Sequence, residues 1–418
     1  MKVIHISTSD ISGGAAKATY KLHHELLRQG IYSRMLVRYK LSKDETVIQY
    51  QPATSILSRL IRKLKRLILQ RKFSAFQFNK QFDVFSTDQS EFSKGFNEYV
   101  KGFDIINLHW ISGFIDFGSF FRRYQDSFKI VWRFADMNPF TGGCHHSWGC
   151  KKFASGCGNC PQSGSAFPED LSAKVMARKK SVLQKVPRNN LHIIILSEWM
   201  YKFVTNGSIF YNYQVSLIPN GVELDIFNPR DKIEAKRTLG IPSTKRVLFL
   251  LADNLNLVMK GSQFGIDAVN MLSDSYFLLL AGSHNVEIPI QIPHHYFGQI
   301  SDKKMLSVLF NAADAFLYTS LQENFPNTAL EAIACGTPIL GFPTGGVLDI
   351  AKEWEHAIYS HELSARALAD TIELAFGTPG KLSEMSVSCA EWAIKKFNVS
   401  VQAQNYIALY NSLLDNKE

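Results

Sequence analysis

The chain has 418 residues, a length that predicts two or three domains. Apolar residues make up 46% and charged residues 20% of the sequence, so we expect large buried cores and exclude a mainly disordered chain. No stretch approaches the ~20 apolar residues of a membrane-spanning helix, and the N-terminus has the pattern of a strand and lacks that of a signal peptide. We therefore expect a cytoplasmic protein.

Short apolar, β-branched runs alternate with helix-length amphipathic stretches, as is typical of parallel sheets covered by helices. In chain order, we expect strands at Val3–Ser7, Arg34–Val37, Ile105–Leu108, Lys129–Phe134, His192–Leu196, Val215–Ile218, Val247–Leu251, Tyr276–Ala281, Ala315–Tyr318, Pro338–Phe342 and His356–Tyr359. We expect helices at Ala16–Arg28, Leu171–Leu183, Gly261–Leu272, Lys303–Asn311, Asn327–Ala334 and Ala390–Leu414.

The expected fold class is α/β, with two Rossmann-like, doubly wound parallel sheets that face a cleft. The first domain is expected at residues 1–196, with Val215–Ile218 and the later strands in the second domain, residues 197–395. A C-terminal helix, residues 396–418, is expected to pack back on the first domain. In such sheets ligands bind beyond the carboxyl ends of the strands.

The turn after the first expected strand runs into a helix through Ser12-Gly13-Gly14-Ala15. Gly13 and Gly14 let a ligand approach the backbone closely, and the free amides of a helix start attract anions. The turn lacks the G-x-G-x-x-G spacing of a dinucleotide-binding loop. A phosphate or sugar contact and a tight turn that serves packing are equally good interpretations.

The formal net charge is +9, and residues 55–74 alone hold seven Lys and Arg with no Asp or Glu. Apolar residues recur at helical spacing in this segment, as in a helix that lies in an anionic membrane interface. We expect contact with an anionic membrane surface; the alternative is a helix packed on the first domain with a solvated basic face. The apolar residues are Ile56, Leu57, Leu60, Ile61, Leu64, Leu67 and Ile68.

Four of the six cysteines fall in a Cys-rich insertion, residues 137–165, whereas Cys335 and Cys389 stand alone. In a cytoplasmic chain such a cluster favours a metal or free thiols over disulfides. The last pair has C-x-x-C spacing, and the first pair is spaced more loosely than in a usual zinc knuckle. We expect a structural zinc ion, with free thiols and then disulfides as alternatives. The four cysteines are Cys144, Cys150, Cys157 and Cys160.

The stretch Ser320–Gly336 joins an expected strand to an expected helix that begins near Asn327. Glu323 precedes the helix, Glu331 lies about one turn inside it, and the free amides near Thr328 suit a phosphate. A sugar nucleotide needs this combination of two hydroxyl acceptors and a pyrophosphate cradle. The alternative is that Glu331 is an ordinary glutamate favoured by the helix dipole.

Together these motifs resemble the signature of family 4 retaining glycosyltransferases with the GT-B fold, found in bacterial capsule, exopolysaccharide and O-antigen assembly. The resemblance spans nearly the whole chain in the expected order. The matching motifs are Gly13-Gly14, Ile218-Pro-Asn-Gly, Phe227-Asn-Pro, Lys260-Gly261, Asn311-Ala-Ala-Asp314, Glu323-x7-Glu331, Cys335-Gly-Thr-Pro and Thr344-Gly-Gly.

The resemblance implies a role for each matching residue. Glu323 would be the catalytic carboxylate that binds the donor sugar's hydroxyls, Glu331 would bind the ribose and Lys260 would neutralise the pyrophosphate. Gly13 and Gly14 would lie over the phosphates or the acceptor. The family generally needs no metal or other cofactor for catalysis, because basic side chains and a helix terminus stabilise the charge. The other donor-binding residues would be Asn324, Phe325, Pro326, Asn327 and Thr328.

The sequence departs from the family pattern at two places. The family usually places an arginine shortly before the lysine, but Leu251–Lys260 contains none. Many relatives carry a histidine before an aspartate after the strand at Lys129–Phe134, where this chain has Ala135 and Asp136. His109 and Asp136 are candidates for the acceptor side, although a lone histidine after an apolar strand is more often a core residue.

The resemblance implies a hexosyltransferase that retains the anomeric configuration. The donor would be a UDP- or GDP-sugar, and we expect the acceptor to be a lipid-linked saccharide at the inner membrane face. The alternatives are a sugar-nucleotide epimerase of the same fold and a non-catalytic relative that binds saccharide or membrane. Nucleic acid is not an expected partner, because Phe73 is the single aromatic of the basic segment.

Overall fold

The computed structural model describes residues 1–74, 76, 79, 84–92, 95–206, 209–284 and 289–415. The chain divides into two compact units, Met1–Pro219 with Gln402–Glu418, and Asn220–Val401. Residues 416–418 of the expected C-terminal segment lie outside the described residues. The division after residue 219 differs from the expected one after residue 196, because the intervening chain completes the sheet of the first unit.

That sheet is parallel throughout, with the strand order β3-β2-β1-β4-β5-β6-β7. We expected the strand at Val215–Ile218 in the second domain, but it is β7 and pairs with β6 (Ile193 opposite Val215). This pairing covers the edge of β6, whose backbone groups would otherwise be left without partners. The strands are β1 (Lys2–Ser9), β2 (Tyr32–Tyr39), β3 (Val47–Gln49), β4 (Ile105–Leu108), β5 (Lys129–Arg133), β6 (Leu191–Ile195) and β7 (Gln214–Leu217).

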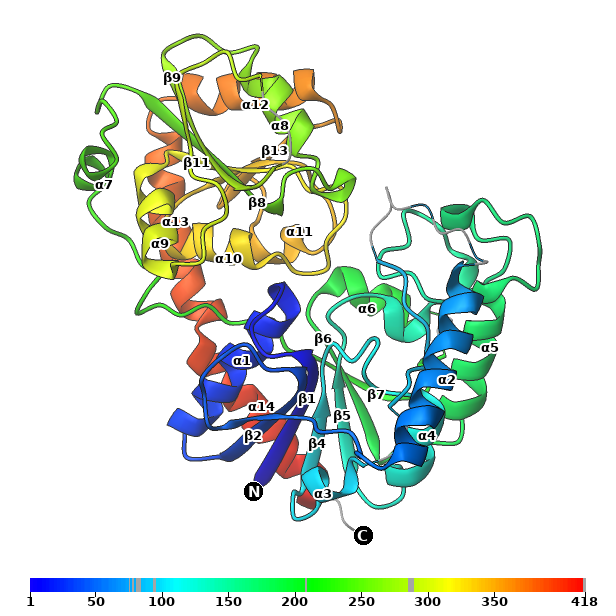
Figure 1. The fold of residues 1–418 in the computed structure, drawn as a ribbon. Coiled ribbons are helices and arrows are strands. Elements are labelled where there is room, and N and C mark those ends of the chain that lie inside the picture. Colours follow the sequence, from blue (N-terminus) through cyan, green and yellow to red (C-terminus); the bar gives the residue numbers. More distant parts are fainter. Residues whose placement is uncertain are drawn as a thin grey trace. The chain divides into compact units, whose positions relative to one another are not determined.

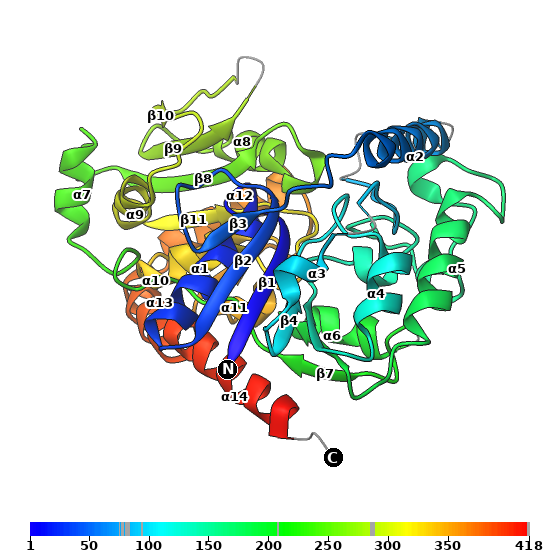
Figure 2. The same cartoon turned by 60° about the horizontal axis from the view of Figure 1, so that its bottom comes forward.

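Helices cover both faces of this sheet (Figures 1 and 2). On one face, α1 (Gly14–Arg28) and α14 (Val399–Asp415) pack on the strands in one apolar cluster that includes Leu22, Tyr406 and Tyr410. An aromatic-rich core lies on the other face. The remaining helices are α2 (Ile56–Ser74), α3 (Asn97–Val100), α4 (Phe117–Tyr124), α5 (Leu171–Leu183) and α6 (Glu198–Thr205), with short 3-10 helices η1 (Asn138–Phe140), η2 (Lys152–Ala154) and η3 (Pro161–Ser163).

The second unit contains a parallel sheet with the order β10-β9-β8-β11-β12-β13. Its strands are β8 (Arg246–Asn254), β9 (Tyr276–Ser283), β10 (His294–Tyr296), β11 (Ala315–Tyr318), β12 (Ile339–Gly341) and β13 (Ala357–Tyr359). Its helices are α7 (Lys232–Thr238), η4 (Val258–Lys260), α8 (Ser262–Val269), α9 (Lys303–Ala312), α10 (Asn327–Ala334), α11 (Val347–Ile350), α12 (Ala365–Gly377) and α13 (Lys381–Phe397).

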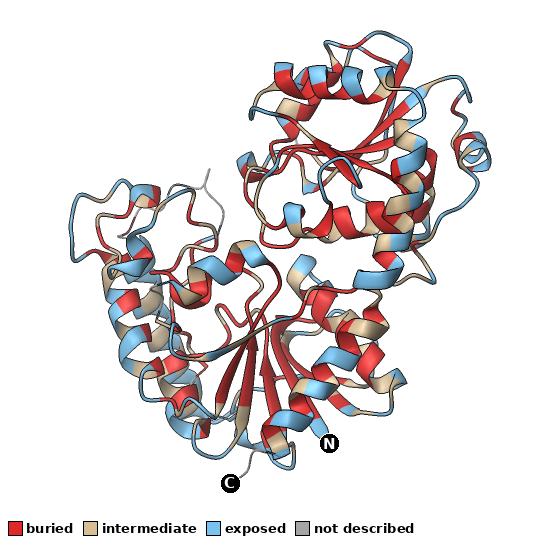
Figure 3. Cartoon of the chain, turned by 180° about the vertical axis from the view of Figure 1, so that it is seen from behind, coloured by how far each residue is buried: buried red, intermediate tan, exposed pale blue. Residues whose placement is uncertain are grey.

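Both sheets are doubly wound, which confirms the expected fold class. In each, the chain runs outward from a central strand, returns to its other side and continues, so the direction switches between β1 and β4 and between β8 and β11. The central strands of both units are buried on both faces (Figure 3), as parallel sheets require. A ligand site is expected at the carboxyl ends of the strands that flank each switch.

The expected single helix at Ala390–Leu414 is wrong, since the chain leaves the helix at Asn398, where φ is −60° and ψ is 130°. Here the N–H of Val222 donates to the carbonyl of Phe397, and the N–H of Val399 donates to the carbonyl of Val222. This local pairing ends α13 and starts α14 one residue later. From Gln402 onward α14 belongs to the first unit.

His5, His23 and His109 are among the buried histidines of the first unit, and each is at most 2% exposed. His5 Nδ1 lies 2.9 Å from Nε2 of His109. Burial lowers the pKa of His5 and of His109 well below the usual value. His23 lies 2.7 Å from the Ser33 hydroxyl and 2.8 Å from that of Thr46, and burial, together with the charge of neighbouring His24, lowers its pKa to about 4.

The unit should therefore lose stability in mild acid. Between about pH 6.5, where a free histidine titrates, and the folded pKa of His23 near 4, the unfolded chain binds a proton that the folded chain excludes. Stability is full above about pH 6.5, and His23 alone should cost about 1 kcal/mol at about pH 5.5. Urea unfolding at about pH 7.5 and pH 5.5 measures this, and His23→Gln should reduce the difference. The same change at exposed His361 is the control, and equal effects of both would contradict the account.

Candidate functional site

In the second unit, two loops meet at the carboxyl ends of β8 and β11, the strands that flank the switch. Lys260 ends η4 in the loop after β8, and Glu323 lies in the loop after β11. The ammonium of Lys260 contacts the Glu323 carboxylate. The two side chains are 22% and 15% exposed, so this ion pair remains accessible to a ligand from solvent.

Backbone packing holds the two loops together. The N–H of Leu321 donates to the carbonyl of Met259 at 2.7 Å, and the hydroxyl of Thr319 donates to the carbonyl of Lys260 at 2.8 Å. Gly261 has a φ of +57°, and a Cβ atom there would lie 2.1 Å from the carbonyl oxygen of Thr319. Glycine is therefore required beside Lys260 for conformation and for space.

A third loop, after β12, fixes the backbone of Glu323. The N–H of Gly346 donates to the Glu323 carbonyl at 3.0 Å. A Cβ atom on Gly345, whose φ is +62°, would lie 1.9 Å from that same oxygen. The Thr344 hydroxyl donates to the carbonyl of Ser320 at 2.5 Å. The Thr344-Gly345-Gly346 motif thus acts as a backbone clamp on the loop that carries Glu323.

The start of α10 follows directly after this loop. Pro326 occupies the N-cap position, and within the described residues no side chain caps the helix. Its first turn contains no acidic residue, so the partial positive charge of the helix start is available to an anion. Asn327 and Thr328 are half-buried, and the Asn220 amide donates to Asn327 Oδ1 at 3.1 Å.

The other expected donor-binding residues lie on the same loop and helix. Asn324 and Phe325 are buried, and the Phe325 ring packs 6.1 Å from the ring of Phe397. Glu331 is half-buried one turn after the start of α10. The structure therefore brings Lys260 and Glu323 into contact beside the helix start.

In the first unit, the turn between β1 and α1 is open at Gly13. Gly13 has a φ of +82°, and no described atom beyond its neighbours would lie within 4 Å of a Cβ there. The fully buried carboxylate of Asp10 anchors the turn by accepting backbone N–H bonds from Ile11, Leu41 and Ser42 at 2.9 to 3.1 Å. We did not predict Asp10 from the sequence, because its bonds depend on a loop thirty residues away.

Asp136, an expected acceptor-side residue, belongs to a buried polar network beyond β5. Its carboxylate lies 2.6 Å from His145 Nδ1 and accepts the indole N–H of Trp110 at 2.8 Å. Burial would raise the pKa of Asp136, but the charge and hydrogen bond of His145 hold it below the usual value. His145 Nε2 lies 3.0 Å from the Ser86 hydroxyl. We did not predict this role of His145 from the sequence, where its position directly after Cys144 in the Cys-rich insertion is a local signal.

The structure does not support the expected acceptor-side role of His109. His109 is 2% exposed and faces His5 inside the core of the first unit. Burial keeps its imidazole neutral by lowering its pKa. It is a core histidine, the alternative that the sequence left open.

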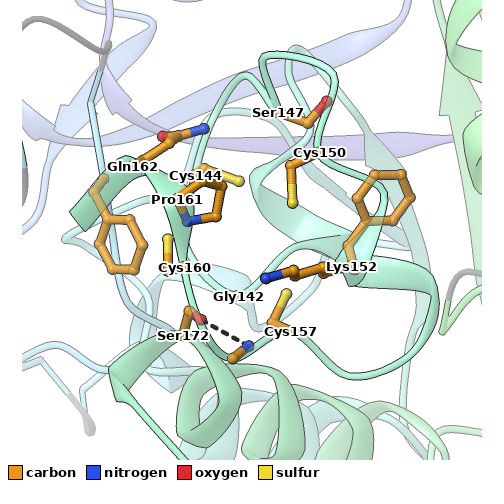
Figure 4. A pocket seen from close by; sticks show the side chains of 13 residues that line it. Gly142, Cys144, Ser147, Cys150, Lys152, Cys157, Cys160, Pro161, Gln162 and Ser172 are labelled. Atoms are coloured by element: carbon orange, nitrogen blue, oxygen red, sulfur yellow. Dashed lines mark hydrogen bonds between the residues drawn. The ribbon is translucent and has the colours of Figure 1, made fainter. Parts of the chain in front are cut away.

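The four clustered cysteines line one cavity in the first unit (Figure 4). Within the described residues no disulfide joins them. No three His, Cys, Asp or Glu side chains of the described part of the chain are already arranged to hold a metal ion.

Comparisons with known proteins agree with this fold. Residues 232–395 match the family model described as glycosyl transferases group 1. The chain is 22% identical over 361 residues to the putative colanic acid biosynthesis glycosyl transferase WcaC of Escherichia coli (strain K12), covering 84% of this chain and 86% of that one.

Two solved structures share the fold over the full chain. Sucrose-phosphate synthase from Thermosynechococcus elongatus superposes with a TM-score of 0.71 at 18% identity, covering 99% of this chain and 100% of that one. Anabaena Alr3699/HepE in complex with UDP-glucose superposes with a TM-score of 0.66 at 15% identity and the same coverage. These findings confirm the GT-B fold and the resemblance seen in the sequence.

The backbone clamp predicts that Gly345→Ala destabilises the second unit. A Cβ at this position would meet the Glu323 carbonyl, so the loop must move, at a cost of about 2–4 kcal/mol. Gly377→Ala, at the end of α12, is the matched control, because no described atom would crowd its Cβ. Thermal unfolding of both variants measures the difference. Equal melting temperatures would contradict the clamp.

Proposed function

We propose that this chain, which has the GT-B fold and matches the group 1 glycosyl transferase model over residues 232–395, transfers a hexose-type unit with retention of the anomeric configuration. The donor would be a nucleoside diphosphate sugar bound by the second unit. The acceptor would be a saccharide, bound by the first unit, in the assembly of a cell-surface polysaccharide. The contact between Lys260 and Glu323 beside the start of α10 is the observation that carries the proposal.

Each part of this arrangement matches one part of such a donor. The ammonium of Lys260 and the amides at the start of α10 would neutralise the diphosphate. Glu323 would accept hydrogen bonds from the sugar hydroxyls, and Glu331 from the ribose. Because Lys260 contacts Glu323 directly, the proposed diphosphate and sugar sites adjoin, as the two parts of the donor do.

The reaction would break the bond between the anomeric carbon and the diphosphate oxygen. Lys260 and the helix start would stabilise the negative charge that develops on the leaving diphosphate, without a catalytic metal ion. The acceptor hydroxyl would bond to the anomeric carbon from the face that the diphosphate leaves. Its proton would pass to the leaving phosphate oxygen, so the products are a nucleoside diphosphate and an extended saccharide.

A UDP-sugar is the donor we test first. The solved structure of HepE, similar in fold, contains UDP-glucose, although a GDP-sugar uses the same diphosphate contacts. The name of the relative WcaC, which refers to colanic acid biosynthesis, supports a polysaccharide pathway. The open turn at Gly13 would contact the acceptor or the phosphates.

We further propose that α2 binds an anionic membrane surface and thereby brings the enzyme to a lipid-linked acceptor at the inner face. Half-buried Ser58, Arg62, Lys65 and Leu69 follow helical spacing and mark the side that faces the first unit. Lys65 Nζ lies 2.9 Å from Asp116 Oδ2, which fixes this orientation.

The seven apolar residues of α2 from Ile56 to Ile68 lie on the side turned away from the unit, and all seven are exposed. The values run from 44% for Ile68 to 78% for Ile56. Lysines and arginines flank this apolar stripe, so the helix offers both the apolar surface and the positive charge that an anionic bilayer attracts. Among the residues that the structure describes, no helix has the length and apolar character needed to cross a bilayer.

Lys260→Ala and Glu323→Gln should each lower kcat about 10²- to 10³-fold, because each removes a group that contacts the reacting donor. Release of UDP from UDP-sugars with a lipid-linked acceptor measures turnover, and NMR of the product gives its anomeric configuration. Arg366→Ala removes an exposed cation paired with Asp370 and is the control. Unchanged turnover of Lys260→Ala, or an inverted product, would contradict the proposal, and an isomerised sugar nucleotide would instead identify an epimerase.

Leu60→Asp with Leu64→Asp should weaken binding to vesicles of anionic phospholipid at least about tenfold, because both leucines would enter the interface. Sedimentation of the full chain with anionic and with zwitterionic vesicles measures this. Leu374→Asp, at a leucine on α12 that is 51% exposed, is the control and should bind as the original chain does. Equal binding of the double variant would show that α2 does not contact the bilayer.

A further inference from the structure

The Cys-rich insertion forms a second site in the first unit, separate from the donor-binding residues. Cys144, Cys150, Cys157 and Cys160 come from two adjacent loops and line one cavity. Figure 4 shows their sulfur atoms pointing inward from different sides. The space at the centre is about 20 Å³, which is enough for one water molecule or one ion and for little else.

Two of the four sulfur atoms accept hydrogen bonds from backbone N–H groups. Gly142 donates to the Cys157 sulfur, and Gln162 and Ser163 donate to the Cys160 sulfur. These hydrogen bonds hold the two sulfur atoms in place at the wall of the cavity.

A buried cation lies beside the same cluster. Lys179 of α5 is 0% exposed, and its ammonium donates to the carbonyls of Asn138 and Thr141 at 2.5 and 3.1 Å. Burial lowers the pKa of this ammonium to about 8, and the negative charge of Asp88 opposes that shift. Four thiolates around a divalent cation carry a net charge of −2, which would add favourable negative charge beside Lys179.

The loops also hold backbone conformations that residues other than glycine rarely adopt. Cys157 has a φ of 64° and Asn159 a φ of 45°. Each such residue costs of the order of 1–3 kcal/mol unless surrounding bonds stabilise it. The N–H of Cys157 donates to the carbonyl of Lys152 and that of Asn159 to the carbonyl of Phe167, which directs the C-x-x-C turn toward the cavity.

We propose that Cys144, Cys150, Cys157 and Cys160 bind one Zn²⁺ ion as a closed, tetrahedral, structural site. Four soft thiolate ligands select Zn²⁺ over harder cations, and a fourth protein ligand leaves no open position for catalysis. The sulfur atoms surround the cavity without yet meeting at ligand distances within the described residues. Zinc binding would therefore require the cysteine side chains to rotate about their Cα–Cβ bonds until the four sulfur atoms meet one centre.

This ion would have a consequence for the acceptor side of the enzyme. Cys144 directly precedes His145, whose ring lies 2.6 Å from the Asp136 carboxylate. A metal bond to Cys144 would fix the backbone that presents His145. The zinc ion would thus hold the network of Asp136, His145 and Trp110 at the carboxyl end of β5 without touching a substrate.

Metal analysis of the full chain, purified without chelator, tests the proposal. We expect about one zinc per chain, and replacement by Co²⁺ should give the strong visible absorption of tetrahedral cobalt with thiolate ligands. Cys150→Ser should lower the zinc content to near zero, and Cys150→His, which restores a ligand, should retain it. Cys389→Ser changes a buried cysteine of the second unit and is the control.

Zinc content and the cobalt spectrum of the unmodified chain decide the question even if a cysteine variant fails to fold. A chain that holds no zinc after exposure to Zn²⁺, with four thiols open to alkylation, would overturn the proposal. So would an intact mass that shows disulfides among the four cysteines. If the unmodified chain binds zinc but shows no transferase activity, that result would count against the proposed function and would leave the proposed zinc site unaffected.

Discussion

Close approach of three backbone segments in the second unit is the constraint on which the proposed donor site depends. The loops after β8, β11 and β12 pass so near one another that a single Cβ at Gly261 or Gly345 would overlap a carbonyl oxygen. This packing brings Lys260 to Glu323 and orients the loop that leads into α10. The glycines of the Lys260-Gly261 and Thr344-Gly-Gly motifs therefore act through space and conformation, and the neighbouring polar residues are the ones we propose to contact the donor.

The two units use charged groups of opposite sign in their loops. The loop after β8 lacks the arginine that relatives usually carry, so Lys260 and the start of α10 are the positive groups that would face a diphosphate. In the first unit, two buried carboxylates hold loops in place. That of Asp10 accepts backbone N–H bonds, and that of Asp136 contacts His145. His145, which belongs to the Cys-rich insertion, contacts the Asp136 carboxylate from another loop.

The sequence pattern predicted those strands and helices whose bounds are set by apolar periodicity and by flanking residues. The strands β4 and β11 and the helices α5 and α10 have the bounds expected from periodicity and flanking residues. The predictions that were wrong concern elements that depend on pairing with distant segments. β7 belongs to the first sheet because it pairs with β6, and the expected C-terminal helix breaks where Val222 pairs with its backbone. Lys260 and Glu323 were both named from motifs. His145 was missed and His109 misplaced, because their surroundings come from residues far away in sequence.

Hydrogen exchange of the full chain, with and without a UDP-sugar, tests the central claim most directly. If the three packed loops form the donor site, added ligand should slow exchange at the amides of residues 257–261, 319–331 and 344–346, and the rest of the second unit should change little. Protection confined to other segments, or none at saturating ligand, would contradict the account, because the loops would then be packed for stability alone.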